Sequence, residues 1–209
     1  MKKEFLSIKK DVETVITIEK AKFICSAKRV SGEDDAKSFV SNIKKKYPDA
    51  THNCYAYIAD SDGIYARFSD DGEPSGTAGM PMLDCLKNNG VFCTAVVVTR
   101  YFGGIKLGTG GLVRAYTDSV LSALNEAGLC KNVLSAVLKV TVNYNVYSLV
   151  LKMLESVMHV KINTEFLADG VKLTFAVPVD FVENVSDKIR DYSAGKSTVL
   201  QINTEYVGY

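Results

Sequence analysis

The stretch Arg100-Tyr101-Phe102-Gly103-Gly104-Ile105-Lys106-Leu107-Gly108-Thr109-Gly110-Gly111 connects a predicted strand to a predicted helix. Five of the nine residues from Gly103 to Gly111 are glycine. Glycine gives up more backbone freedom on folding than any other residue, so this density indicates positive φ angles or close approach by another group. Arg100, Lys106 and, a little further on, Arg114 add positive charge, which favours an anionic group at this segment.

The neighbours of this glycine-rich segment (residues 100–111) predict how it is held. Residues 91–99 are almost all apolar or β-branched, which is typical of a strand buried on both faces. From Gly110 to Ala127 apolar residues recur at four-residue spacing and predict a helix, which Gly128 ends. Backbone N–H groups and the positive end of the helix dipole then point into one cavity. A phosphate or carboxylate site and a purely structural tight turn are both consistent with this arrangement.

The rest of the first 130 residues also mixes strands and helices. Alternating and helical patterns predict paired strands at 14–18 and 23–28, a helix at 36–47, a hairpin of strands 54–59 and 64–68, and a helix at 81–89. Pro48 ends the first of these helices, and Pro81 begins the second.

The last third of the chain has a different and regular pattern. Apolar and polar residues alternate in 138–142, 160–166, 171–177 and 200–206, and helical stripes occur at 146–158 and after Asp180. The order β-α-β-β-α-β is that of a ferredoxin-like domain, and each strand has a polar face, so one side of its sheet should be open. We therefore expect an α+β protein of two domains, 1–130 and 131–209, with the boundary at 128–134.

Composition excludes several classes of protein. The 209 residues carry a net charge of +1, too little for a protein that coats nucleic acid by bulk electrostatics, although residues 1–46 hold 12 Lys and Arg against 7 Asp and Glu. The five cysteines are widely spaced without a C-x-x-C pair, so neither a zinc ribbon nor a disulfide framework is expected. No apolar stretch is long enough for a membrane helix, and the start lacks the apolar core of a secretory signal. These features predict a cytoplasmic location.

A second polar segment, residues 70–79, supplies three carboxylates close together, those of Asp70, Asp71 and Glu73. With His52 and Thr77 they form a candidate polar site. Such carboxylates can act as acid and base or hold Mg²⁺ through water. They can equally cap the turn and the following helix, or pair with Arg67, Arg100 and Arg114, which is the alternative we favour. His52 lies two residues from Cys54 on a predicted strand, but a buried cysteine beside a surface histidine is the commoner arrangement. We assign no catalytic residue and no metal ligand.

At these residues the sequence resembles the YigZ/IMPACT family. The resemblance rests on residues 51–57, 70–79 and 96–116, in which the run from Arg100 to Gly108 matches the family signature. Lys22-Phe23-Ile24 also fits, with Ala21 where the family more often has serine. The resemblance implies an amino-terminal domain like those of a ribosomal protein, the fourth domain of elongation factor G and the GHMP kinases, and a second domain like the fifth domain of elongation factor G. Eukaryotic relatives act in translational control and carry a different accessory domain in place of the ferredoxin-like one, so their partner is not carried over to this chain.

Two functional hypotheses follow. The first is a non-enzymatic binding protein that contacts RNA, the ribosome or translation factors through the glycine-rich segment and its helix, with an anion or nucleic-acid site made of Arg100, Tyr101, Gly103, Gly104, Lys106, Gly108, Gly110, Gly111 and Arg114. Tyr101 and Phe102 are then the candidates for base stacking.

The second hypothesis is an enzyme or ligand-binding protein that takes a phosphorylated small molecule in the glycine-rich segment, with Asp70, Asp71 or Glu73 as base or metal ligand. It is the weaker one, because Thr109 stands where a P-loop has lysine and Val113 where a dinucleotide loop has its third glycine. Neither hypothesis includes a cofactor or a membrane partner. The first hypothesis loses its main support if the three carboxylates neutralise Arg100, Lys106 and Arg114.

Overall fold

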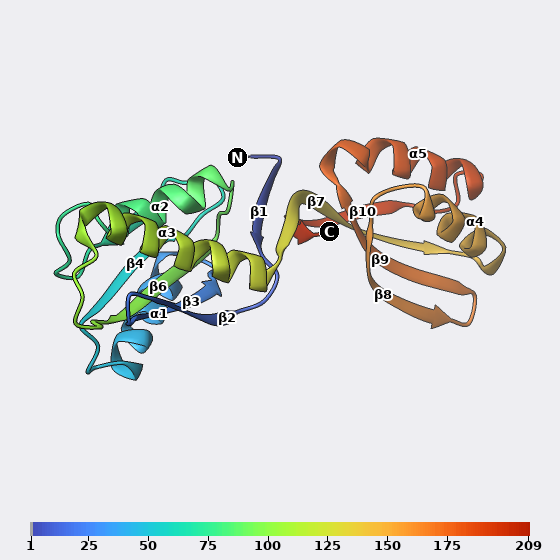
Figure 1. Cartoon of the computed structure of the whole chain (residues 1–209). Helices are drawn as coiled ribbons and strands as arrows, with labels where there is room; N and C mark the ends of the chain where they lie inside the picture. The colour runs from blue at the N-terminus through green and yellow to red at the C-terminus, as the bar shows by residue number, and fades with distance from the viewer. Residues whose placement is uncertain (1) are drawn as a thin grey trace. The chain divides into compact units, whose positions relative to one another are not determined.

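The computed structural model describes residues 2–209, and the chain forms two compact units, Met1–Cys130 and Lys131–Tyr209 (Figure 1). Each unit combines a β-sheet with α-helices, which confirms the predicted two-domain α+β fold. None of the helices in residues 2–209 combines the length and apolar character that crossing a membrane requires.

The first unit is built on an antiparallel sheet with the strand order β2-β3-β6-β4-β5. The strands of this sheet are β2 (Val12–Ile18), β3 (Ala21–Arg29), β4 (His52–Ile58), β5 (Ala66–Ser69) and β6 (Thr94–Tyr101). The unit also contains a strand outside this sheet, β1 (Glu4–Ile8). The central strand β6 is buried from Thr94 to Arg100, as its nearly continuous apolar sequence predicted. It begins at Thr94 and not at Val91, because Cys93 has a left-handed φ of +49° that interrupts the extended backbone.

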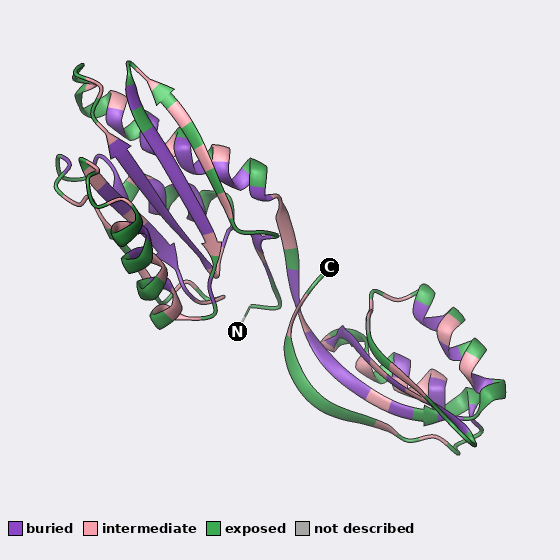
Figure 2. Cartoon of the chain, turned by 90° about the horizontal axis from the view of Figure 1, so that it is seen from below, coloured by how far each residue is buried: buried purple, intermediate pink, exposed green. Residues whose placement is uncertain are grey.

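Helices cover both faces of this sheet, which is why β6 is apolar on both sides. On one face α1 (Glu33–Lys46) packs its buried stripe against Ala95 and Val97. On the other, α2 (Gly79–Asn88) and α3 (Gly108–Ala127) pack against Val96 and Val98. Figure 2 shows the resulting buried band along the middle strands of the sheet.

The second unit has the ferredoxin-like element order and strand order. Its elements are β7 (Leu129–Val142), α4 (Tyr144–Glu155), β8 (Val160–Leu167), β9 (Gly170–Pro178), the 3₁₀ turn η1 (Val179–Phe181), α5 (Val182–Tyr192) and β10 (Val199–Gly208). The strands lie in the order β10-β7-β9-β8, all antiparallel. Both helices share one hydrophobic core with one face of the sheet, and Lys139 and Lys172 lie on the opposite, open face.

Two β-bulges in this unit interrupt its outer strands, for which the sequence predicted strict alternation. In β8, Val160 lies opposite Ala176 on the open face, whereas Thr164 lies opposite Leu173 on the core face. The same shift occurs in β10 at Ile202. An extra residue at a bulge moves all later side chains to the other face, so residues that share one sequence period end on different sides.

Candidate anion-binding site at the glycine-rich segment

The structure requires glycine at different positions of the glycine-rich segment for different reasons. A Cβ atom at Gly103 would lie 2.1 Å from the carbonyl carbon of Lys20, so only glycine can pass the turn between β2 and β3. Gly104 and Gly108 have φ angles of +85° and +72°. Gly111 approaches Leu107, whereas a Cβ atom at Gly110 would meet nothing within 4 Å. The fold therefore explains most of these glycines but not Gly110, which stands in the exposed first turn of α3.

The N-terminus of α3 is open. Within the described chain no side chain caps it, since the N-cap position is occupied by Leu107. The first N–H groups of a helix have no partner within the helix, and the helix dipole adds partial positive charge there. Gly108, Thr109 and Gly110 are all exposed, so these groups are available to a ligand.

A cavity of about 460 Å³ lies at this helix end. It is lined by residues of β4, the 70–79 segment, β6 and α3: Thr51, His52, Glu73, Pro74, Arg100, Phe102, Lys106, Leu107, Gly108, Thr109 and Leu112. Lys106 is exposed and forms no ion pair or hydrogen bond with any residue from 2 to 209. Arg114 is likewise unpaired within that range, but it lies outside the lining of the cavity. Lys106 is thus the free cation of this cavity.

Arg100 differs from the other two cations because an internal carboxylate neutralises it. Its residue is 5% exposed, and its Nη1 lies 2.6 Å from Glu73 Oε1. The guanidinium stands between the rings of Phe23 and Phe102, at 5.5 and 5.6 Å from their centroids. Its buried Nε atom has no hydrogen-bond partner among the described residues. Arg100 therefore lines the cavity without adding net charge to it.

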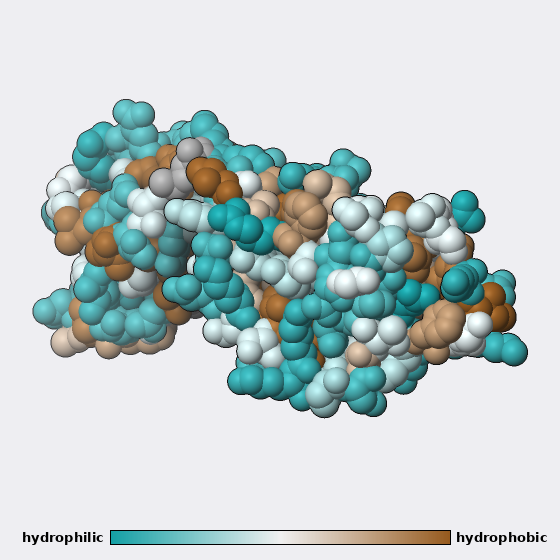
Figure 3. Space-filling view, turned by 90° about the vertical axis from the view of Figure 1, so that its left-hand side faces the viewer, coloured by the Kyte–Doolittle hydropathy of each residue, from teal (hydrophilic) through white to brown (hydrophobic). Residues whose placement is uncertain are grey.

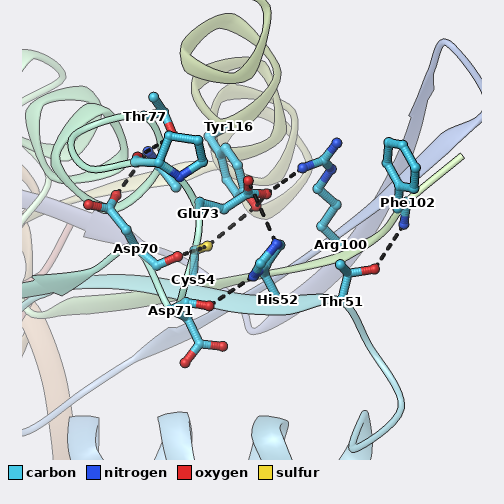
Figure 4. A network of polar contacts seen from close by, with 12 residues as sticks. Thr51, His52, Cys54, Asp70, Asp71, Glu73, Thr77, Arg100, Phe102 and Tyr116 are labelled. Atoms are coloured by element: carbon cyan, nitrogen blue, oxygen red, sulfur yellow. Dashed lines mark hydrogen bonds and ion pairs between the residues drawn. The ribbon is translucent and has the colours of Figure 1, made fainter. Parts of the chain in front are cut away.

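Glu73 is the centre of the polar network (Figure 4). Its side chain is 3% exposed, and besides Arg100 it accepts a 2.7 Å hydrogen bond from the Tyr116 hydroxyl. His52 Nε2 lies 3.8 Å from the other carboxylate oxygen of Glu73. Burial, followed by the neighbouring Cys54 and Glu73, raises the pKa of Tyr116, so this hydroxyl stays protonated and keeps donating to the carboxylate.

His52 and Asp71 connect this network to α1. His52 Nδ1 donates to the Asp71 carbonyl at 2.9 Å, so the other ring nitrogen faces Glu73 and the cavity. The Asp71 carboxylate accepts from Lys44 at 2.6 Å and from the Asn53 N–H at 2.7 Å. Burial alone would raise the pKa of Asp71, but these two bonds lower it below its ordinary value.

The remaining members of the predicted polar site serve the turn itself. Asp70 accepts three backbone N–H groups, from Gly76, Ala78 and Gly79, and so caps the start of α2. The Thr77 hydroxyl donates to the Pro74 carbonyl at 2.7 Å.

Each of the carboxylates of Asp70, Asp71 and Glu73 is engaged by cations or N–H groups, which favours the structural alternative, while their role as base or metal ligand stays a prediction. Among residues 2–209, no group of three or more His, Cys, Asp and Glu side chains is placed to hold a metal ion.

The Cys54 thiol is not placed to act as a nucleophile in the cavity. Its thiol is fully buried and donates to the Asp70 carbonyl at 2.9 Å. Burial raises its pKa to about 12, so the reactive thiolate is absent at neutral pH. The neighbouring His52 turns its ring to Asp71 and Glu73, which leaves the cysteine without a base.

Tyr116 and Lys44 are the network residues that sequence reasoning missed. Tyr116 fitted the apolar stripe of its helix, and its ring does pack edge-on against Phe23 at 5.4 Å. A signal was nonetheless present, since a buried tyrosine hydroxyl needs a hydrogen-bond partner. Nothing in the sequence connects Lys44 to Asp71, 27 residues away.

Comparison with known proteins gives two family matches and full-length relatives. Residues 19–124 match the Impact N-terminal domain, and residues 140–196 match a domain of unknown function, DUF1949. The chain is 47% identical to IMPACT family member YvyE of Bacillus subtilis over 67% of this chain and 64% of that protein. It is 37% identical to IMPACT family member YigZ of Escherichia coli over 91% of this chain and 94% of that protein. A crystal structure of a hypothetical protein, 36% identical, superposes with a TM-score of 0.62 over 97% of this chain and 99% of the other.

Proposed function

Because this chain belongs to the IMPACT family, we propose that it is a non-enzymatic binding protein that contacts RNA, the ribosome or a translation factor in the cytoplasm and takes part in translational regulation. The role of eukaryotic relatives in translational control supports the biological setting. Cys25, Cys54, Cys85 and Cys93 are free thiols, which supports a reducing compartment.

One observation supports the binding surface: the open N-terminus of α3 lies at a cavity that is also lined by the free Lys106. Helix N–H groups and a lysine ammonium both suit a phosphate oxygen. Gly110, which the fold does not require, keeps this helix end uncovered.

The surroundings favour RNA as the source of that phosphate. Phe102 is 48% exposed beside the cavity and offers a ring on which a base can stack. Tyr101 is held by its hydroxyl, which donates to Asp49, so Phe102 is the better candidate of the two. Figure 3 shows mainly hydrophilic surface with scattered hydrophobic patches on the face in view.

Fluorescence anisotropy with single-stranded and structured RNA tests this proposal at about 50 and 200 mM salt. We expect Lys106→Ala to weaken binding and to reduce the salt slope by about 0.7–0.9, the value of one lost phosphate contact. Lys87→Ala, which removes an exposed and unpaired lysine of α2, is the matched control and should bind as wild type. Absence of binding at the lower salt, or equal binding by Lys106→Ala, contradicts the proposal.

The concave shape of the cavity favours a second candidate, a phosphorylated small ligand. Its volume of about 460 Å³ falls within the range of about 300–1,000 Å³ for small-molecule sites. A thermal-shift screen with nucleotides and sugar phosphates, with and without Mg²⁺, tests it, because a ligand at about 100 times its Kd adds about 2.7 kcal/mol to stability. A flat screen removes this candidate and leaves RNA binding unaffected.

A further inference from the structure

A second concave surface lies on the α1 side of the same sheet. This α1 groove has a volume of about 980 Å³ and is lined by Glu33, Lys37, Val40, Ser41, Lys44, Lys45, Pro48, Tyr55, Tyr57 and Arg67. It shares no lining residue with the cavity at α3.

The groove exists because α1 covers only part of its face of the sheet. The helix packs on β6 and on Tyr57 of β4, which leaves the edge strand β5 uncovered. Tyr57 and Arg67, which pair across β4 and β5, form part of the floor. Lys37, Ser41 and Lys45 recur at four-residue spacing, so they stand along one side of α1 and form the wall.

The groove carries an excess of positive charge. Glu33 is its one acidic residue, and it pairs with Lys37 at 3.3 Å and with Arg67 at 3.9 Å. Lys44 is engaged by Asp71 outside the lining. Lys45 is exposed and has no ion pair within residues 2–209. Four cations therefore face two carboxylates, and Lys45 is free to meet an anion.

Aromatic rings lie beside these cations. The rings of Tyr55 and Tyr57 are 6.0 Å apart and nearly parallel, at 10°. Tyr57 is buried and its hydroxyl donates to Glu33 at 3.3 Å, so the inner ring is fixed in place. Tyr55 is only half-buried, and Lys44 Nζ stands 5.8 Å from its centroid. An aromatic ring on a sheet face, bordered by lysines, is the arrangement on which sheet-based modules stack the bases of single-stranded RNA.

We propose that the α1 groove binds single-stranded RNA, with one base on Tyr55 and the neighbouring phosphates on Lys45 and Arg67. An acidic peptide would meet the same lysines, but its Asp and Glu side chains carry no aromatic ring to stack on the tyrosines. The inference rests on the proposed function for the class of partner, and it assigns that partner a second surface.

The chain contains no tryptophan, so Tyr55→Trp places a single fluorescent reporter in the groove. We expect a single-stranded oligoribonucleotide to quench this tryptophan saturably, and an abasic strand of equal length to leave it unquenched. In anisotropy titrations we expect Tyr55→Ala to weaken binding about 5- to 150-fold, the range for losing one stacked base. Lys45→Ala, an exposed change that does not threaten folding, should also weaken binding, and Lys87→Ala should not.

The outcomes separate this inference from the proposed function. Quenching that persists when Lys106→Ala is added to the reporter variant, with unchanged affinity, supports the groove and removes the site at α3. RNA binding that depends on Lys106 while the reporter tryptophan stays unquenched and Lys45→Ala binds as wild type overturns the groove and leaves the site at α3. Equal quenching by the abasic strand, or equal competition by polyglutamate, shows that the groove reads charge alone and also overturns it.

Discussion

The pair Gly103→Ala and Gly110→Ala tests whether the glycine-rich segment serves the fold at one position and a ligand at the other. A Cβ atom at residue 103 would lie 2.1 Å from the Lys20 carbonyl carbon and 2.2 Å from the Ala21 nitrogen. Both are backbone atoms of the turn between β2 and β3, so the turn must move. We expect Gly103→Ala to lower the free energy of unfolding by about 3 kcal/mol or more, at the upper end of overpacking effects.

Gly110→Ala should act in the opposite direction on stability. Its Cβ atom would meet nothing within 4 Å, and the residue lies within α3. Alanine is better than glycine in a helix by up to about 1 kcal/mol, which in a chain of this length raises Tm by about 2–4 °C. The new methyl group points toward the N-terminus of the helix, where the free N–H groups are, so phosphate binding should weaken.

Urea unfolding followed by circular dichroism measures the two stabilities, and RNA anisotropy measures binding. The reasoning requires Gly110→Ala to be at least as stable as wild type and to bind RNA more weakly. A stable Gly110→Ala protein with wild-type affinity would refute the idea that this glycine keeps the helix end open for a ligand. A Gly103→Ala protein of wild-type stability would refute the close approach to the turn.

Three further predictions concern the polar network. Glu73→Ala leaves the Arg100 guanidinium buried without its carboxylate, so urea unfolding should show a loss of about 3–5 kcal/mol; a loss below about 1 kcal/mol would contradict the buried pair. Asp71 has a folded pKa lowered below its ordinary 3.8, so its stabilisation is complete above about pH 5 and is lost as the pH falls through the folded pKa. The stability difference between wild type and Asp71→Asn should therefore shrink between about pH 6 and pH 3, and a constant difference would disprove the lowered pKa. The Cys54 thiol, buried with a pKa of about 12, should resist iodoacetamide at about pH 8 until urea unfolds the protein, whereas rapid labelling of the native protein would show that it is accessible.

Sequence periodicity predicted the elements of this fold well, because burial on one or two faces leaves a direct record in the residue pattern. Strand β6 shows what such a pattern can predict and what it cannot. Its apolar run predicted burial on both faces, and Arg100 falls on the same face as Val96 and Val98, which pack toward α2 and α3. That phase already indicated a buried arginine in need of a counter-charge. The sequence favoured the three carboxylates of residues 70–79 as that counter-charge, but only the contact between segments 27 residues apart shows that Glu73 supplies it.

The bulges at Ile162 and Ile202 could not be predicted from the sequence for a related reason. A bulge is defined by pairing with another strand, and a single strand's alternation looks the same with or without it. The candidate site follows the same division. The glycines, Lys106 and the helix start are local features and could be identified from sequence, whereas the network that fixes His52, Glu73 and Tyr116 is made by contacts between distant segments.

The two candidate RNA surfaces meet at Asp71. Its carbonyl oxygen fixes the His52 ring at the wall of the cavity before α3, and its carboxylate holds Lys44 at the wall of the α1 groove. The backbone of Asp71 has a left-handed φ of +46° at this point. Residues otherwise suited to acid–base chemistry are thus used to align donors on two sides of one sheet. That use explains why the carboxylates of the 70–79 segment are engaged in ion pairs and caps while Lys45 and Lys106, one in each surface, remain free for an anionic strand.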